Sequence, residues 1–107
     1  MSPSRAVLSP EARKDLEDIE AYIAERDGEL RATAIVERLN KTIRNLAFMP
    51  GMGVRRYYLK RNERAFSVVP WTIFYEELPE RENIAVVRII DGRRDLPGLF
   101  GKNKKKR

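Results

Sequence analysis

Basic and apolar side chains occur close together in the stretch RIIDGRRDLPGLF, residues 88–100, where a run of β-forming residues ends. A guanidinium group can bind a phosphate or a carboxylate through two hydrogen bonds, and neighbouring apolar side chains can dock on a protein surface. These residue types fit three activities: phosphate chemistry on a nucleic acid, inhibition of another protein by contact, or nucleic-acid binding without chemistry. The candidate residues of this stretch are Arg88, Arg93, Arg94, Leu96, Leu99 and Phe100.

The chain has no histidine and no cysteine. Imidazole is the usual general base at neutral pH, and imidazole and thiolate are the usual zinc ligands, so catalysis would have to use Arg, Lys, Tyr, Asp or Glu. The acidic residues lie mostly on predicted helical faces or at residues 76–82, without a close cluster at neighbouring strand ends. We therefore expect no metal site and no cofactor. The missing cysteines also fit a reducing compartment.

Positive charge is concentrated in the second half of this 107-residue chain, whose formal net charge is +6. Residues 1–50 hold 8 basic and 9 acidic side chains, whereas residues 51–107 hold 14 and 7. This excess indicates an anionic partner, nucleic acid or an acidic protein segment, or else a solvated surface. Length and composition predict one compact domain over residues 1–100 and a basic, disordered tail over 101–107. Without a signal-peptide pattern or a membrane span, we expect a cytoplasmic protein.

The first half predicts a strand and two helices. Residues 5–8 form a short apolar run, and Ser9 and Pro10 then provide a helix-capping residue and a first-turn proline. Apolar residues recur at three- and four-residue steps from 12 to 23 and again from 32 to 46, with Gly28 at the break. The pattern predicts a helical hairpin that ends at the Pro-Gly-Met-Gly turn, residues 50–53.

The second half changes to β-forming residues. Strands are predicted at residues 54–60, 64–69, 71–77 and 84–90, with Pro70 marking a break, a bulge or an edge. Short turns join these strands, so they should form an antiparallel meander that the helical hairpin covers on one face. The predicted fold class is α+β, a helical hairpin on a three-to-five-stranded antiparallel sheet, in the order β-α-α-β-β-β with one optional further strand.

Cations and aromatic rings occur together in the sequence RRYYLKRNER, residues 55–64. Strand alternation would place Arg56 and Lys60 on one face together with Tyr58. Such a surface could bind phosphate with aromatic stacking. The outer face of any helix-covered sheet is polar, however, and tyrosine is a good strand former, so the pattern has a purely structural interpretation as well. Arg64, at the end of this stretch, joins the candidate residues.

Four segments, in order, resemble the ParE branch of the ParE/RelE toxin superfamily, the toxic halves of bacterial toxin–antitoxin pairs. They are LSPEARKDLEDIEAYIAE (8–25), LNKTIRNLAFMPGMG (39–53), WTIFYEE (71–77) and VVRIIDGRRDLPGLF (86–100). The last segment is the most specific, and together they cover almost the whole chain. The resemblance implies an antiparallel sheet against a helical hairpin. It also implies a partner, a ParD-like antitoxin that forms a hetero-oligomer with the toxin.

The superfamily has two activities, so the fold alone does not decide the function. RelE-like members cut messenger RNA on the ribosome with basic residues and often a C-terminal tyrosine, whereas ParE-like members inhibit DNA gyrase stoichiometrically. Phe100, six residues after Arg94, takes the tyrosine position and has no hydroxyl group. The resemblance therefore favours a gyrase inhibitor without catalytic residues. Arg64 and Arg94 match phosphate-binding positions of the nucleases. The alternative is therefore a ribosome-dependent endoribonuclease, with Arg64, Arg88 and Arg94 as phosphate and transition-state stabilisers, and direct nucleic-acid binding is a secondary possibility.

The residues expected to contact the target or the antitoxin are Arg64, Arg88, Arg93, Arg94, Leu96, Leu99 and Phe100. Asp91 and Gly92 supply a turn, after which the apolar tail should fold back over an edge of the core. We expect Leu96, Leu99 and Phe100 to pack near the groove between the helical hairpin and the sheet, with the two turn arginines at its rim. An acidic amphipathic segment of the antitoxin could cover this region.

Overall fold

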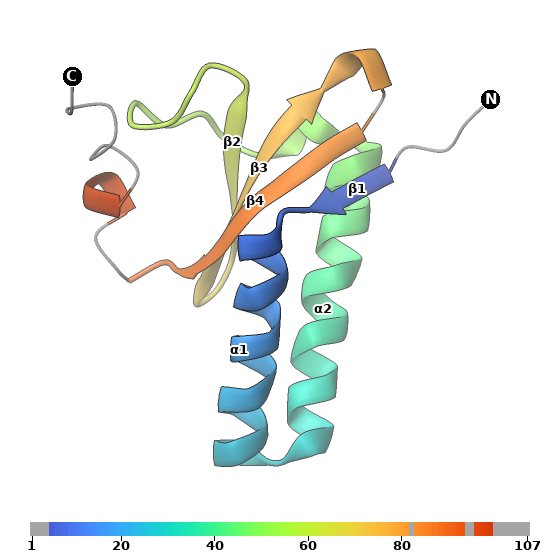
Figure 1. Cartoon of the computed structure of the whole chain (residues 1–107), viewed down its shortest axis with the longest axis vertical. Helices are drawn as coiled ribbons and strands as arrows, with labels where there is room; N and C mark the ends of the chain where they lie inside the picture. The colour runs from blue at the N-terminus through green and yellow to red at the C-terminus, as the bar shows by residue number, and fades with distance from the viewer. Residues whose placement is uncertain (1–4, 82, 94–95, 100–107) are drawn as a thin grey trace.

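The computed structural model describes residues 5–81, 83–93 and 96–99, and shows two helices packed on one face of a four-stranded sheet (Figure 1). The elements are β1 (Arg5–Leu8), α1 (Pro10–Asp27), α2 (Glu29–Phe48), the 3₁₀ turn η1 (Pro50–Met52), β2 (Glu63–Val68), β3 (Trp71–Leu78), the 3₁₀ turn η2 (Pro79–Arg81) and β4 (Asn83–Asp91). One further helical turn follows at residues 96–99. The predicted order and the helical hairpin are confirmed. The predicted tail at 101–107 lies outside the described residues.

Ser9 begins α1 and joins it to the sheet. Its hydroxyl oxygen accepts a hydrogen bond from the Ala12 N–H at 3.0 Å, which satisfies one of the free amides of the first helical turn. The same hydroxyl donates to the Val87 carbonyl of β4 at 2.8 Å. Gly28 separates the two helices with a φ of 95°, a backbone conformation that L side chains rarely adopt. The helix boundaries therefore follow directly from local sequence.

The sheet is mixed, which corrects the expectation of a fully antiparallel one. The strand order is β1-β4-β3-β2; β3 pairs antiparallel with β2 and β4, whereas β1 pairs parallel with β4. Strands 2 to 4 are consecutive and joined by short turns, as predicted. The first strand is different because the helical hairpin and two further strands separate it from β4. That long connection allows the parallel direction, which a short turn does not.

The predicted strand at 54–60 is wrong. Only Val54 pairs, through two hydrogen bonds with Ala65 of 2.9 and 2.8 Å, and the residues after it form turns. Tyr58 and Leu59 are both buried against the sheet. A strand would send two neighbouring side chains to opposite faces, so burying both requires a turn instead. Here the need to cover apolar surface outweighed the β-propensity of the segment.

The sheet has apolar side chains on both faces. The face toward the helices forms the main core, with buried Ala12, Leu39, Ile43, Leu46, Ala47, Val68, Ile73, Tyr75, Ile84, Val86 and Ile89. The opposite face holds a second cluster, made of Tyr58, Leu59, Ala65, Phe74 and Ile90, with Leu96 packed against it. Since helices cover only one face, the loop before β2 and the turn at 96–99 cover part of the other (Figure 1).

One carboxylate fastens α1 to β4. Asp15 accepts hydrogen bonds from Arg88 Nε at 2.8 Å and Nη2 at 3.0 Å, and from the Ile89 N–H at 2.8 Å. The Asp15 side chain is 13% exposed. Hydrogen bonding to this carboxylate raises the pKa of Arg88. The arrangement is a bidentate ion pair with an additional backbone donor, a geometry that gives strong, charge-assisted hydrogen bonds.

Replacing Asp15 by Asn should lower the free energy of unfolding by about 1–3 kcal/mol, because it removes the charge from three hydrogen bonds and leaves Arg88 without its counterion. Urea denaturation followed by circular dichroism measures the change. The control is Asp18→Asn, since the Asp18 side chain is 64% exposed in its pair with Lys14 and should change stability by less than about 0.5 kcal/mol. Equal stability of the two variants would show that Asp15 does not fasten the helix.

Candidate functional site

A groove lies between the inner face of the helical hairpin and the β2–β3 turn. Its volume is about 400 Å³. The hairpin extends beyond the sheet (Figure 1), so the inner faces of α1 and α2 near Gly28 have no strand packed against them. The apolar part of the lining is Ile19, Ile23, Ile35, Val69, Pro70 and Trp71. The groove is thus a continuation of the main core that the chain leaves open.

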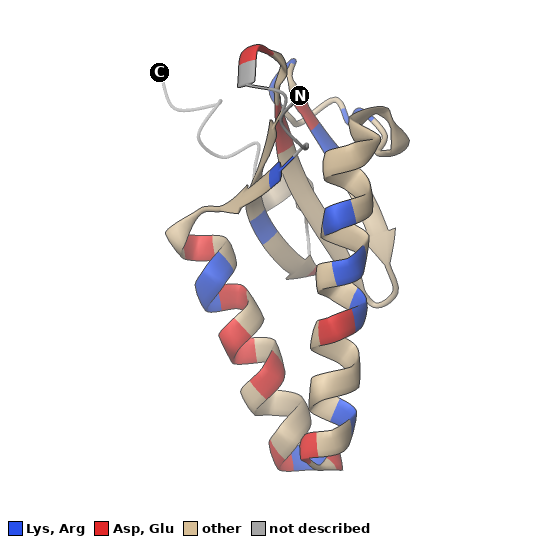
Figure 2. Cartoon of the chain, turned by 90° about the vertical axis from the view of Figure 1, so that its right-hand side faces the viewer, with Lys and Arg blue, Asp and Glu red and all other residues tan. Residues whose placement is uncertain are grey.

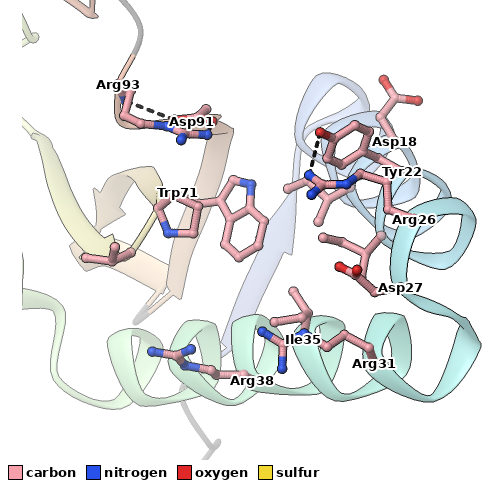
Figure 3. Close-up of a pocket in the computed structure, with 14 residues that line it drawn as sticks. Asp18, Tyr22, Arg26, Asp27, Arg31, Ile35, Arg38, Trp71, Asp91 and Arg93 are labelled. Atoms are coloured by element: carbon pink, nitrogen blue, oxygen red, sulfur yellow. Dashed lines mark hydrogen bonds and ion pairs between the residues drawn. The ribbon is translucent and has the colours of Figure 1, made fainter.

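In this groove Val69 and Tyr22 are exposed, and Trp71 is partly buried. Trp71, the sole tryptophan of the chain, directs its indole from β3 toward the two helices (Figure 3). Val69 is 76% exposed and Tyr22 is 55% exposed. Exposed apolar side chains that share one concave surface are typical of a binding site for a protein segment. The groove therefore has the shape and polarity of a docking site.

The rim of the groove is rich in arginine. Arg26, Arg31, Arg38 and Arg93 line it, together with Asp18, Asp27 and Asp91. Arg26 donates to the Tyr22 hydroxyl at 2.8 Å, and this bond raises the pKa of Arg26. Arg93 donates through Nε to Asp91 at 2.9 Å. Arg31 and Arg38 form no ion pair within the described part of the chain. Two guanidinium groups are thus available to an acidic ligand.

The two helices differ in charge (Figure 2). Acidic side chains predominate along α1, whereas basic side chains predominate along α2. In the groove, Arg31 and Arg38 come from the basic helix. The basic excess predicted for the second half of the chain therefore begins already on α2, before residue 51.

Arg64, a predicted contact residue, connects β2 with the loop that follows α2. Its Nε forms a close ion pair with Glu77 of β3, and its Nη1 donates to the Gly53 carbonyl at 2.9 Å. Tyr75, which is fully buried, binds the same loop: its hydroxyl accepts from the Gly53 N–H at 2.8 Å and donates to the Pro50 carbonyl. A Cβ at position 53 would lie 2.4 Å from that hydroxyl, so glycine is required there. Arg64 holds the fold in this structure.

The other predicted residues lie in separate places. Arg88 is held by Asp15 beneath α1, whereas Arg93, in the turn after β4, lies at the rim of the groove as expected (Figure 3). Leu96 contradicts the expectation: it packs against the second cluster, on the sheet face opposite the helices. The helices do not cover the apolar side chains of that face. Burying Leu96 against them, after the turn at Asp91 and Gly92, is therefore favourable.

Another predicted contact residue, Leu99, does not line the groove. Leu99 is 38% exposed in the helical turn at 96–99. Arg94 and Phe100 lie outside the described residues. Conversely, Tyr22, Arg26 and Trp71 line the groove but were not predicted as contact residues. Helical periodicity identified the apolar face of α1 that includes Tyr22, but not the point along it where the sheet ceases to provide cover.

Residues 6–96 match the family model described as ParE toxin of type II toxin-antitoxin system, parDE. The chain belongs to the ParE toxin family. Toxin ParE3 of Caulobacter vibrioides is 30% identical to it over 98 residues, which covers 92% of this chain and 96% of that protein. The resemblance inferred from the four sequence segments is thus confirmed.

Solved structures agree with the ParE-family fold. The chromosomal ParDE toxin–antitoxin system of P. aeruginosa superposes with a TM-score of 0.68 at 16% identity, over 83% of this chain and 96% of that chain. The RelBE2 toxin–antitoxin complex of Mycobacterium tuberculosis superposes with a TM-score of 0.56 at 17% identity, over 84% of this chain and 99% of that chain. At these identities the likeness shows the fold alone.

The described residues of this ParE-family chain contain no group of three or more potential metal-ligating side chains. No helix among them is long and apolar enough to cross a membrane.

Burial raises the pKa of Tyr75, so the fold favours its protonated form. Its contribution to stability should be complete below about pH 10 and be lost as pH rises through the higher pKa of the folded state. At pH 7, Tyr75→Phe should be less stable by about 1–2 kcal/mol, because the Gly53 N–H loses its acceptor. Above pH 10 this difference should narrow.

Urea denaturation of both proteins at several pH values from neutral to alkaline measures that difference. Tyr57→Phe is the control, since Tyr57 is 87% exposed and should behave as the parent at every pH. A stability difference that stays constant across the alkaline range would contradict the role given to the Tyr75 hydroxyl.

Proposed function

We propose that this ParE-family chain inhibits DNA gyrase by direct contact, without catalysis, and that a ParD-like antitoxin neutralises it in the cytoplasm. Membership of the family supports a toxin, and the arginine geometry supports contact over cleavage. Of the three arginines assigned to phosphate and transition-state stabilisation in the ribonuclease alternative, Arg64 and Arg88 lie within the described residues. Both are instead hydrogen-bonded to carboxylates of the chain itself.

The engagement of these arginines is the observation that carries the proposal. Turning Arg88 toward a phosphate would leave Asp15 charged at 13% exposure, and turning Arg64 would release Glu77 and the loop at Gly53. Withdrawing one partner from a partly buried ion pair leaves the other charge without compensation, which destabilises the fold. The absence of histidine and the phenylalanine at position 100 add to this, because the chain then lacks imidazole, the commonest proton-transfer group, and a tyrosine hydroxyl at that position.

The groove between the hairpin and the β2–β3 turn is the proposed antitoxin site. The relatives solved in ParDE and RelBE2 systems are described as toxin–antitoxin systems or complexes. A fitting segment would place apolar side chains over Trp71 and Ile35 and carboxylates beside Arg31 and Arg38. Apolar anchoring supplies most of the affinity in such a site, and charge complementarity supplies specificity and association rate.

Purified full-length chain should inhibit supercoiling by DNA gyrase at near-equimolar ratios, since a contact inhibitor acts stoichiometrically. Cleaved DNA should accumulate in the same reactions, and preincubation with the antitoxin should restore supercoiling. Agarose-gel supercoiling assays measure both. Normal supercoiling, together with transcripts cut at ribosomal A sites during expression, would contradict gyrase inhibition and support the ribonuclease alternative.

Charge reversal by Arg31→Glu with Arg38→Glu should raise the dissociation constant for the antitoxin about tenfold at low salt and less at high salt, because screening weakens rim charges. The control is Arg13→Glu with Arg44→Glu, a pair of exposed cations on the same two helices that do not line the groove. Calorimetric titration measures the constants, and Trp71 fluorescence reports occupancy. Equal loss in both double variants would indicate an effect of net charge alone.

A further inference from the structure

A second surface, separate from the groove, combines exposed cations with an exposed aromatic ring. We call residues 55–61, RRYYLKR, the basic loop; it holds four cations and no acidic residue. Arg55, Arg56, Lys60 and Arg61 are all exposed. None of them takes part in an ion pair within the described part of the chain. These charges are therefore available to an anionic ligand.

The basic loop has a fixed shape. Tyr58 and Leu59 are buried in the second cluster, so its middle is anchored to the sheet. The Leu59 N–H donates to the Arg56 carbonyl at 3.0 Å, and the Lys60 N–H donates to Glu63 Oε1 at 2.9 Å. The Arg55 guanidinium donates to the Arg61 carbonyl, which joins the two ends of the loop. A surface organised before binding loses less conformational entropy when a ligand arrives.

Tyr57 projects from this loop and is 87% exposed. Its ring contacts the ring of Tyr58 edge-to-face, with centroids 5.2 Å apart and planes at 88°. Tyr58 is itself only 8% exposed, so the exposed Tyr57 ring packs against a side chain that the core holds in place. An exposed ring that is held in place and flanked by cations is a platform on which an unpaired base can stack while its phosphates contact guanidinium groups.

We propose that the basic loop binds single-stranded nucleic acid, with Tyr57 stacking on a base and Arg56 and Lys60 contacting the backbone. An acidic protein segment would use the charges but has no specific need for the exposed ring. A duplex would also bind the cations, but its bases are stacked on each other and are not available to stack on Tyr57. Because cations make the contacts to the nucleic-acid backbone, we expect the affinity to fall markedly as the salt concentration rises.

This site is independent of the groove and of the gyrase proposal. The basic loop precedes β2, and the groove begins at Val69 just after β2 ends, so about 20 Å of extended chain separates them. An antitoxin segment in the groove would leave the basic loop uncovered. The chain could then contact DNA or RNA strands while bound to a protein partner.

Fluorescence anisotropy with the full chain tests the site, using labelled oligothymidylate and oligouridylate of about 12 nucleotides and a duplex of the same length. Tyr57→Ala should weaken single-strand binding about fivefold or more, whereas Tyr57→Phe should retain it. Phe48→Ala is the matched control, since Phe48 is an aromatic residue 79% exposed outside the basic loop. It should bind as the parent does.

The backbone contacts are tested by Arg56→Gln with Lys60→Gln, which should reduce the slope of log affinity against log salt by about 1.4 for single strands. The control pair Arg13→Gln with Arg44→Gln should leave the slope unchanged. All variants keep the basic residues 102–107, so any binding by that segment is common to them.

Single-strand binding that depends on both Tyr57 and the two cations supports the proposal. Parental affinity in Tyr57→Ala, tighter binding of the duplex than of either single strand, or equal slopes in the two glutamine pairs would each overturn it. Competition by polyglutamate that is indifferent to Tyr57 would overturn it as well, in favour of a general anion site. Gyrase inhibition is read in separate assays, so either proposal can fail alone.

Discussion

The ion pair between Asp15 and Arg88 fixes how the helical hairpin lies on the sheet. It joins the first third of α1 to the middle of β4, and Asp15 also accepts a hydrogen bond from the Ile89 N–H. Ser9, six residues before Asp15, makes a second connection to β4. Because α1 is attached near its start, its far end projects past the sheet together with α2 (Figure 1). The open groove is a direct result of that attachment.

The two helices cover only one face of the sheet, so the other face is covered by segments without regular structure. The loop before β2 contributes the buried side chains of Tyr58 and Leu59 to this face, and the turn at 96–99 contributes the partly buried Leu96. Apolar burial contributes about 25 cal/mol per Å², so these side chains stabilise the fold even without regular structure. Tyr57, the exposed neighbour of the buried Tyr58, is then presented on a rigid support.

The parts of the fold that could be predicted from sequence are those that local sequence signals determine. Ser9, Pro10 and Gly28 set the helix boundaries through caps and backbone conformation, and β2 to β4 follow from β-propensity and short turns. The parallel pairing of β1 could not be predicted, because its partner lies 78 residues away. The loop at 55–60 and the position of Leu96 depended on which sheet face lacked cover. The groove depended on where the hairpin outruns the sheet, which is a tertiary property.

The pairing of β1 with β4 also affects synthesis of the protein. Arg5 pairs with Asn83 and Leu8 with Val86, so β1 can complete its ladder only after β4, 78 residues further along the chain, has been synthesised. The helical hairpin and the β2–β3 pair have local contacts and can form earlier. Until β4 has left the ribosome, α1 also lacks the Arg88 guanidinium that binds Asp15. A shortened translation product that stops before residue 83 would therefore retain the groove-lining helices but not the attachment that positions them.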